Sequence, residues 1–271
     1  MQKVINAENE ATKMHAVILA GDRPGGNLLA KSFDLENGVL VKIHGKTCLQ
    51  RVIEALGDCK IISNMSVIGL GENDVQQDGS LQKISSRLDC HWLVPETGPA
   101  ASAVKAVTLA NSFPCLLTTG DHALLSSNII ATFLNDAKQV PGDFIVGLVP
   151  FSNVYNAFPA SKRTLLKFPE GVFCGSNLFL IKNAEGIKIL EYWKKVEELR
   201  KKPWRIARQL GLRCLISYFA GLLSLEKALG EISSQAGAKL SYATISDPVA
   251  AIDIDTKADY DLAVTWLANE N

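Results

Sequence analysis

The chain lacks an excess of charge of either sign, because its 28 lysine and arginine residues balance its 28 aspartate and glutamate residues. A protein without net charge has no overall field that would attract nucleic acid or an anionic membrane. The chain also lacks an uninterrupted apolar run of about 18 residues, the length that a bilayer-spanning helix needs. Residues 1–13 contain no apolar stretch typical of a signal peptide, and we expect a flexible tail there. We therefore expect a cytoplasmic protein without nucleic-acid binding or stable membrane insertion.

The cysteines lack the close spacing that a zinc or redox site requires. No two of the six form a CxxC motif; they are Cys48, Cys59, Cys90, Cys115, Cys174 and Cys214. Most of them lie inside apolar runs, so we expect buried thiols and no disulfide framework. Any bound anion must then be held by a local group of donors rather than by a metal–thiolate centre or by the net charge.

What the chain does have is apolar residues, which make up 47% of its 271 residues and suffice for a full core. Short apolar runs occur before loops at 15–20, 65–70, 90–94, 114–119, 143–149, 177–181 and 240–245. Most of these runs are unbroken rather than alternating, which is typical of strands covered on both faces. They predict a buried and mainly parallel sheet.

Helix-like stretches separate these runs, at 47–59, 80–88, 98–111 and 126–138. Regular alternation of strands and helices predicts an α/β three-layer sandwich. From residue 183 to 237 the pattern changes to consecutive helices, so we expect a helical elaboration before the last strand. We interpret residues 14–271 as one domain that includes this elaboration.

A glycine-rich loop follows the first predicted strand and reads LAGDRPGG, residues 19–26. In open α/β sheets, ligands bind beyond the carboxyl ends of the strands, where loop N–H groups can face phosphate oxygens. The loop is neither a Walker motif nor a GxGxxG fingerprint, and a plain turn is the alternative interpretation. Arg23 favours phosphate, because a guanidinium group binds phosphate oxygens in bidentate fashion.

Two acidic motifs follow other predicted strands. TTGDHALL places Asp121 at the end of a strand, where a carboxylate can bind Mg²⁺; the alternative is a helix-capping aspartate. AIDIDTKADYDLA, residues 251–263, places Asp253 and Asp255 on one side of an extended segment. The alternative here is a solvated acidic turn before a helix that Thr256 caps. Three such features on one sheet favour a nucleotide and metal site.

These motifs together resemble the MobA-like NTP transferase family. Its members are nucleotidyltransferases with a GT-A type Rossmann-like fold, among them molybdenum cofactor guanylyltransferase and many sugar-phosphate nucleotidyltransferases. The matching segments are LAGDRPGGNLLAK, VLVKIHGKTCLQRVIEAL, PETGPAASAVKAV, TTGDHALL and AIDIDTKADYDLA. More narrowly, the chain is similar to a bacterial branch with an LAGDR loop and a stretch like RKKPWRIARQLG.

The resemblance implies roles for individual residues. The implied nucleotide-binding residues are Leu19, Ala20, Gly21, Asp22, Arg23, Gly25, Gly26, Leu70, Gly71, Glu96, Gly98 and Ser102. The implied acceptor-binding residues are Gly175, Ser176 and Asn177, for which a bend in a core strand is the alternative. The implied Mg²⁺ ligands are Asp121, Asp253 and Asp255.

One position departs from the family pattern. The family has a lysine near the reacting phosphates where this sequence has Gly38. Lys42 lies four residues further on, about 13 Å away along an extended chain, which is too far for a substitute. Lys31 is the better candidate, and we count it with Arg23 and Asp121 as catalytic.

The reaction that the resemblance implies is transfer of NMP from an NTP to a small phosphorylated acceptor, with release of pyrophosphate. The acceptor would be a sugar phosphate, a cofactor phosphate or a lipid-precursor phosphate. The alternatives are a catalytically impaired nucleotide-binding module and a GT-A type glycosyltransferase, although the DxD motif of the latter is replaced by GDHALL. The sequence also allows a homodimer.

Overall fold

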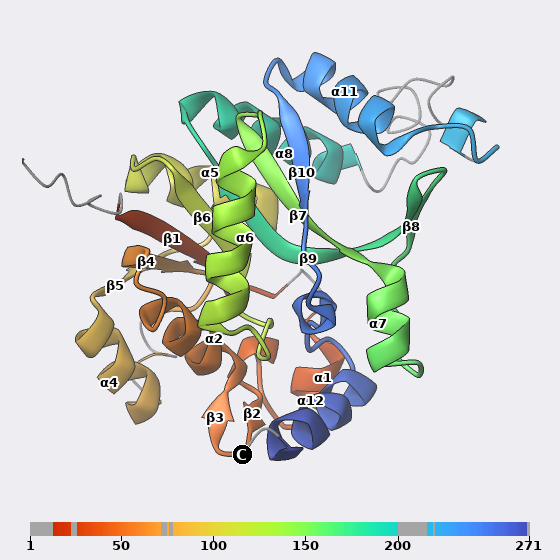
Figure 1. The fold of residues 1–271 in the computed structure, drawn as a ribbon. Helices are drawn as coiled ribbons and strands as arrows, with labels where there is room; N and C mark the ends of the chain where they lie inside the picture. Colours follow the sequence, from red (N-terminus) through yellow and green to blue (C-terminus); the bar gives the residue numbers. More distant parts are fainter. Residues whose placement is uncertain are drawn as a thin grey trace, which may run out of the picture.

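The computed structural model describes residues 13–22, 26–71, 75, 78–199, 216–218 and 220–269. A central sheet of eight strands runs through this part of the chain (Figure 1). Across the sheet the strand order is β10 (Leu240–Thr244), β7 (Phe144–Pro150), β9 (Gly171–Ile181), β6 (Cys115–Thr119), β1 (Met14–Leu19), β4 (Ile62–Ile68) and β5 (Cys90–Leu93). A short β8 (Leu166–Phe168) pairs with β9. Since only β9 runs antiparallel to β6 and β7, the sheet is mainly parallel, as predicted.

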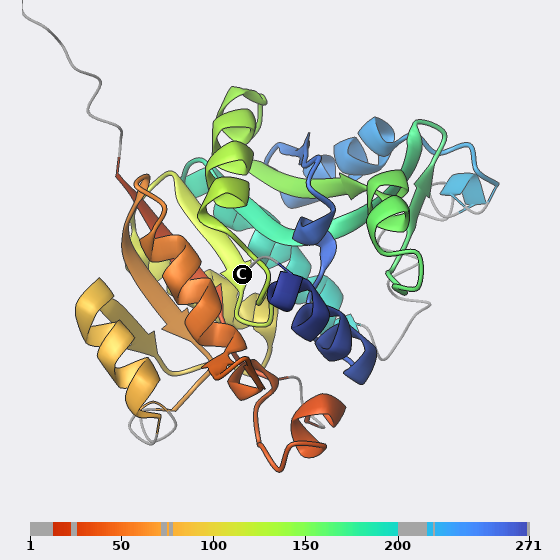
Figure 2. The ribbon, with the colours of Figure 1, turned by 60° about the horizontal axis from the view of Figure 1, so that its bottom comes forward.

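Helices cover both faces of the sheet, which confirms the three-layer α/β prediction (Figures 1 and 2). One face packs against α2 (Cys48–Gly57), α4 (Gly79–Leu88), α6 (Ser127–Gln139) and α12 (Lys257–Asn269). The other face packs against α5 (Pro99–Ala110) and α8 (Ile187–Leu199). Every residue of β1 is buried, which explains why this strand is apolar apart from His15.

The predicted strands and helices are found within a few residues of their expected bounds. The elements that sequence reasoning missed are mostly short: α1 (Leu28–Lys31), the hairpin of β2 (Lys42–Ile43) and β3 (Lys46–Thr47), α7 (Phe151–Ala157), β8 and the start of β9. Two to seven residues give too little periodicity to be recognised. Short 3₁₀ turns lie at Gly38–Leu40, Ala184–Gly186 and Pro248–Ala251.

The expected helical elaboration at 183–237 contains α8 and α11 (Leu225–Ala236), and β10 follows it. Residues 200–215 and 219 of this stretch, and residues 1–12 of the expected tail, lie outside the described residues. Among the helices that the structure describes, none combines the length and apolar character that crossing a bilayer requires.

The described cysteines are all free thiols, and four of the five are buried, as expected. Cys214 lies outside the described residues. Burial raises the pKa of Cys48 and of Cys115 to about 12, so both remain uncharged near neutral pH. These two thiols therefore act as small apolar side chains of the core.

Candidate active site

The carboxyl ends of β1 and β6 meet at one edge of the sheet. The backbone N–H of Gly120 donates to the carbonyl oxygen of Leu19 at 2.8 Å, which ties the two strand ends together. A cavity of about 350 Å³ opens beyond them. Its lining includes Gly21, Asp22, Asp121, Asn177, Asp253 and Asp255. The fold thus brings the glycine-rich loop and both acidic motifs to one place.

Asp121 lies at the floor of this cavity. Its Oδ1 atom is buried and has no hydrogen-bond partner among the described residues. Removal from water, together with the negative charges of Asp253 and Asp255, raises the pKa of Asp121 to about 7, although the Thr119 hydroxyl acts in the opposite direction. An unpartnered carboxylate oxygen beside two like charges is a position that a cation would stabilise.

The IDID segment alternates as the sequence predicted. Ile252 and Ile254 have no exposed surface, whereas Asp253 and Asp255 line the cavity. The backbone N–H of Ile254 donates to the carbonyl oxygen of Asp121 at 3.0 Å. This hydrogen bond fixes the segment next to the end of β6, so the two acidic motifs keep a constant relation.

The helix cap expected at Thr256 is present as well. The Asp259 carboxylate accepts hydrogen bonds from the backbone N–H of Thr256 at 2.9 Å and from its hydroxyl at 2.6 Å. The N–H of Asp259 donates back to the Thr256 hydroxyl at 3.3 Å. This is the reciprocal pattern of a capping box at the start of α12. The motif therefore serves as a cap and also presents Asp253 and Asp255 to the cavity.

Arg163 is a site residue that sequence reasoning missed. Its guanidinium group forms ion pairs with Asp253 and Asp259, and only 7% of its side chain is exposed. The Asn177 amide also donates to Asp253, at 3.4 Å. No local pattern could have identified Arg163, because its partners lie 90 and 96 residues away in the sequence.

These contacts bear on the expected metal ligands. Asp253 already has a cationic partner, so Asp121, whose Oδ1 atom has no hydrogen-bond partner among the described residues, fits a metal ion better than Asp253 does. Within the described part of the chain, no group of three or more histidine, cysteine or acidic residues is arranged to hold a metal. Mg²⁺ does not require such a group, because it is commonly held by one or two carboxylates together with water and substrate phosphates.

The neighbouring His122 is buried, with 1% of its surface exposed. Burial lowers its pKa to about 4, and the imidazole is therefore neutral near neutral pH. His122 is therefore not a charged group of the site.

The loop after β1 is held by a close backbone approach. A Cβ atom on Gly69 would lie 2.0 Å from the backbone nitrogen of Gly21, and Gly69 has a φ of +135°. Only glycine fits such a position. Asp22 accepts a hydrogen bond from the Gly38 N–H at 3.0 Å, so its carboxylate holds this loop in place. Arg23 and Gly25 lie outside the described residues.

A second cavity of about 210 Å³ adjoins the first, and both share Leu19, Gly21, Asp22 and Pro99. Three further predicted nucleotide-binding residues line it: Glu96, Gly98 and Ser102. The Ser102 hydroxyl accepts a hydrogen bond from the Glu96 N–H at 3.0 Å. Ala20 and Leu70 instead pack in the core, and Ile68 and Gly69 line this cavity next to Leu70. Gly71 follows them along the chain.

The N-terminus of α5 faces this second cavity and has a partner that the sequence did not reveal. Glu197 of α8 accepts a hydrogen bond from the Ala100 N–H at 3.1 Å. The helix has no side-chain cap of its own, since Gly98 occupies the N-cap position. Glu197 therefore supplies a negative charge that stabilises the N-terminus of this helix.

The expected acceptor residues lie at a bulge in β9. Asn177 has a φ of +52°, and the pairing register of β7 with β9 shifts between Val146 and Leu148. The Ser176 hydroxyl donates to the Gly147 carbonyl oxygen at 2.9 Å and is buried. Asn177 lines the main cavity, and both Gly175 and Asn177 line an adjoining hollow beside Asp253. The strand-bend interpretation thus fits Ser176, while Gly175 and Asn177 remain accessible to a ligand.

Trp193 also lines the main cavity and was not predicted. It projects from α8, is 37% exposed, and packs against Phe179 with ring centroids 6.1 Å apart. The surrounding helix reads as an ordinary amphipathic segment, so the sequence contained no sign of this role. A partly exposed indole at this point offers a flat apolar surface to a bound ligand.

Lys31 lies next to the glycine-rich loop. Its ammonium nitrogen would be 3.4 Å from a Cβ atom placed on Gly26. Lys31, the expected substitute for the family lysine, therefore lies near the loop. Gly38 itself has no space for a larger residue, because a Cβ atom there would lie 2.3 Å from Asn27 Nδ2. Asn27 caps α1 by accepting hydrogen bonds from Leu29 and Ala30.

This crowding determines what we expect when the family lysine is introduced at Gly38. Gly38→Lys alone should destabilise the protein by about 1–3 kcal/mol, the usual cost of overpacking, rather than raise turnover. Asn27→Ser/Gly38→Lys should recover much of that loss, because serine keeps the cap and frees the space. Urea unfolding of the two variants checks this, and equal stability of Gly38→Lys and the parent protein would contradict it.

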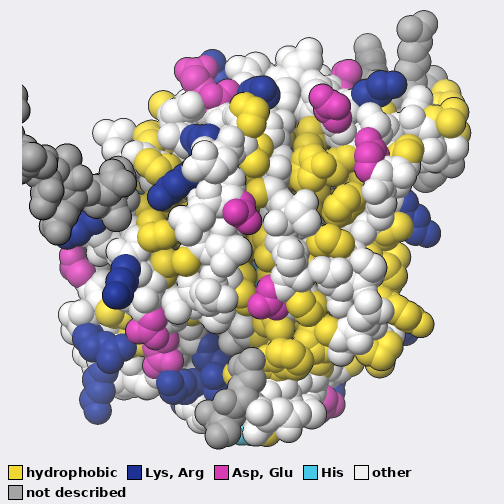
Figure 3. Space-filling model, viewed as in Figure 1, with side chains coloured by type: hydrophobic (Ala, Val, Ile, Leu, Met, Phe, Trp, Pro, Cys, Tyr) yellow, Lys and Arg dark blue, Asp and Glu magenta, His cyan; other side chains and the backbone are white. Residues whose placement is uncertain are grey.

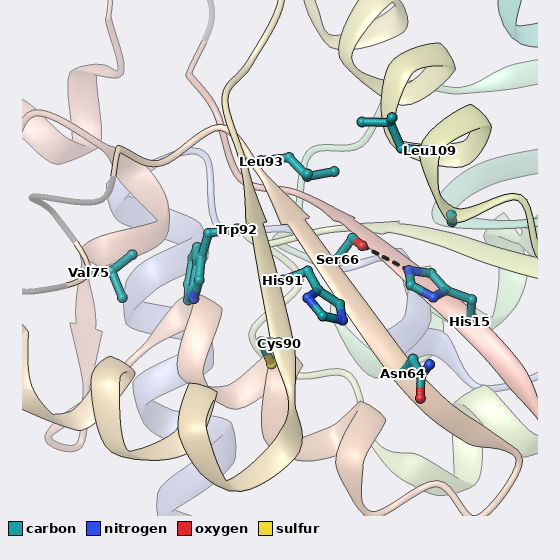
Figure 4. A pocket seen from close by; sticks show the side chains of 10 residues that line it. His15, Asn64, Ser66, Val75, Cys90, His91, Trp92, Leu93 and Leu109 are labelled. Carbon is teal, nitrogen blue, oxygen red and sulfur yellow. Dashed lines mark hydrogen bonds between the residues drawn. The ribbon is translucent and has the colours of Figure 1, made fainter.

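A larger hollow, about 750 Å³, lies elsewhere, on β1, β4 and β5 (Figure 4). His15 Nε2 and Ser66 Oγ lie 2.9 Å apart there in a hydrogen bond. Among the residues that the structure describes, no aspartate or glutamate lines this hollow to complete a triad with the pair. Burial raises the pKa of the adjacent Cys90 to about 11, and the Asp89 charge contributes, so its thiol is not activated.

Comparison with known proteins identifies related folds. A family model described as the MobA-like NTP transferase domain matches residues 16–155. A hypothetical transferase from Thermus thermophilus aligns with a TM-score of 0.76 and 24% identity, over 92% of this chain and 99% of that one. No curated protein matches the sequence.

Two further solved structures are similar at lower identity. One is a 4-diphosphocytidyl-2C-methyl-D-erythritol synthase from Anaerococcus prevotii, with a TM-score of 0.57 and 10% identity over 95% of this chain and 97% of that one. The other is a CMP:2-keto-3-deoxy-manno-octonic acid synthetase in complex with CTP, with a TM-score of 0.58 and 12% identity over 96% and 100% of the two chains. At these identities the similarity concerns the fold.

Proposed function

The chain belongs to the MobA-like NTP transferase family, and from this premise we propose that it transfers NMP from an NTP to a small phosphorylated acceptor and releases pyrophosphate. One observation carries the proposal: Gly21, Asp22 and Gly26 of the glycine-rich loop line a single cavity at the carboxyl edge of the sheet together with Asp121, Asp253 and Asp255. A GT-A type sheet needs its phosphate donors and metal carboxylates at this edge. We also propose that the reaction takes place in the cytoplasm.

Asp121 and Asp255 would hold Mg²⁺, which supplies positive charge to the reacting phosphates. The unpartnered Oδ1 atom of Asp121 supports this assignment, as does the raised pKa that its carboxylate has beside two other acidic residues. Asp253, which is already paired with Arg163, is the third and weaker candidate.

The other task of the protein is to align the acceptor phosphate with the α-phosphorus of the NTP. An oxygen of the acceptor phosphate attacks the α-phosphorus of the NTP, a new P–O bond forms, and the bond to pyrophosphate breaks. The loop N–H groups, Arg23 and Lys31 would stabilise the charge that develops on pyrophosphate. An acceptor phosphate is already ionised, so no general base is required. The bulge at Gly175 and Asn177 would position the acceptor beside Asp253.

The test is a matrix of reactions. The protein is incubated with Mg²⁺, each NTP in turn and a panel of phosphomonoesters, and pyrophosphate release is assayed. CTP enters first, because a similar structure was solved with CTP. NTP binding without pyrophosphate release from any pair would favour the impaired binding module. Transfer of a sugar from a nucleotide sugar would favour the glycosyltransferase.

Lys31→Ala is expected to reduce turnover by at least about tenfold while changing NTP affinity little, because a contact made in the transition state affects kcat rather than binding. Its position beside Gly26 motivates the prediction. Lys46→Ala is a suitable control, since Lys46 pairs with Glu54 at the surface. If kcat of the Lys31 variant equals that of the control, Lys31 does not replace the family lysine.

A further inference from the structure

A third hollow extends from the candidate active site towards α12. It has a volume of about 300 Å³ and shares Asn177, Asp253 and Asp255 with the main cavity. The other lining residues that a ligand would contact include Lys162, Arg163, Gly175 and Thr256. A phosphate placed beside the acidic pair would therefore have open space on this side, away from the predicted nucleotide residues.

The same hollow continues into an apolar crevice of about 360 Å³. The two share Lys162, Thr256 and Asp259. The crevice separates the segment 158–162, which follows α7, from the first turns of α12. Its apolar lining consists of Phe158, Pro159, Ala160, Ala258 and Leu262. Figure 3 shows hydrophobic side chains gathered on this side of the molecule, over α7 and α12.

The polar end of this path carries two positively charged side chains, Lys162 and Arg163. Arg163 is paired with both Asp253 and Asp259, so it compensates one of their two negative charges. Lys162 is exposed and has no hydrogen bond or ion pair with any described residue. A phosphate group at the polar end would meet the ammonium group of Lys162, while five apolar side chains line the crevice at the other end.

We propose that the acceptor is amphiphilic: a phosphomonoester whose phosphate lies between Lys162 and the acidic pair and whose apolar part fills the crevice beside α12. This proposal rests on the proposed function and specifies its acceptor. We place the apolar part in the crevice because the crevice and the third hollow share Lys162, Thr256 and Asp259, and the third hollow adjoins the active-site cavity. Burial of each methylene there would add binding free energy in proportion to the apolar area removed from water.

The test uses n-alkyl phosphates from ethyl to octyl as probes, below their micelle concentrations. Isothermal titration calorimetry on the full chain, with Mg²⁺ present, gives their dissociation constants. Affinity should increase by up to about 4-fold for each added methylene until the crevice is full. Lys162→Ala should weaken the binding of every probe by a similar factor, because it removes only the phosphate contact.

Two variants separate the crevice from general apolar binding. Ala258→Asp places a carboxylate in the crevice on an exposed helical position and should abolish the dependence on chain length. Leu109→Asn, on the exposed surface of α5, should leave that dependence unchanged. Ethyl and octyl phosphate binding with equal affinity would overturn the proposal. Self-association would also overturn the proposal. In that case sedimentation would show an assembly that Ala258→Asp disrupts, and alkyl chain length would have no effect on binding.

The outcomes also separate this proposal from the proposed function. If chain length raises affinity but no NTP and phosphomonoester pair releases pyrophosphate, the nucleotidyltransferase assignment fails and the amphiphile site remains. If pyrophosphate is released with short and long acceptors at equal kcat/KM, the enzyme assignment stands and the amphiphilic acceptor is rejected.

Discussion

Asp121→Asn is expected to abolish Mg²⁺-dependent nucleotidyl transfer and to raise the stability of the protein at about pH 8. The loss follows from the removal of a metal carboxylate that an amide replaces poorly. The gain follows from burial, which raises the pKa of Asp121 to about 7, so that its ionised form is costly in the folded state. A residue with a purely structural role would not lose function while gaining stability.

The pH dependence has a definite sign. The folded-state pKa of Asp121 lies above its ordinary value of 3.8, so between that value and about 7 the folded state binds more protons than the unfolded state. Stability should therefore fall as pH rises through this window in the parent protein. The Asn variant should lack this contribution. Thermal unfolding at several pH values, without metal, measures the difference.

Asp143 offers a matched comparison of opposite sign. Its pKa is lowered by hydrogen bonds from the Asn183 side chain and the Lys239 N–H, so Asp143→Asn should destabilise the protein at about pH 8. Added Mg²⁺ should raise the Tm of the parent protein and of Asp143→Asn, but not that of Asp121→Asn. A Tm increase by Mg²⁺ in Asp121→Asn equal to that of the parent would remove Asp121 from the metal site.

Arg163→Met is expected to lower the free energy of unfolding by about 3 kcal/mol, because removal of one partner leaves buried charge uncompensated. The guanidinium group holds two carboxylates, and the side chain of one of them, Asp259, is 10% exposed. Urea denaturation of the purified variant measures the loss. The neighbouring Lys162→Met, at an exposed position, should change stability by less than about 0.5 kcal/mol.

A double variant tests the cause. Arg163→Met/Asp259→Asn should recover part of the loss, since it removes one of the two uncompensated charges. A stability of Arg163→Met within the error of the parent would show that solvent already screens both carboxylates. No recovery in the double variant would assign the loss to the packing of the arginine side chain rather than to its charge.

The sequence by itself determined the layers and the edge at which the site forms. Unbroken apolar runs such as that of β1 reflect burial on both faces, and the alternation of Ile252, Asp253, Ile254 and Asp255 follows the period of an extended chain. Because parallel strands end at one edge of a sheet, motifs that follow their strands must meet there. Both kinds of pattern are local, so each can be recognised within one short segment of the sequence.

Only the tertiary structure decided which side chains complete the site. Arg163 reaches Asp253 across 90 residues, Glu197 caps α5 across 97, and Asn27 occupies the space where a side chain at Gly38 would lie. These contacts depend on how loops and helices pack at the end of the sheet, and no periodicity of the chain encodes that packing. The sequence could therefore place Asp121 at the site, but the partner that neutralises Asp253 and the reason for Gly38 came from packing alone.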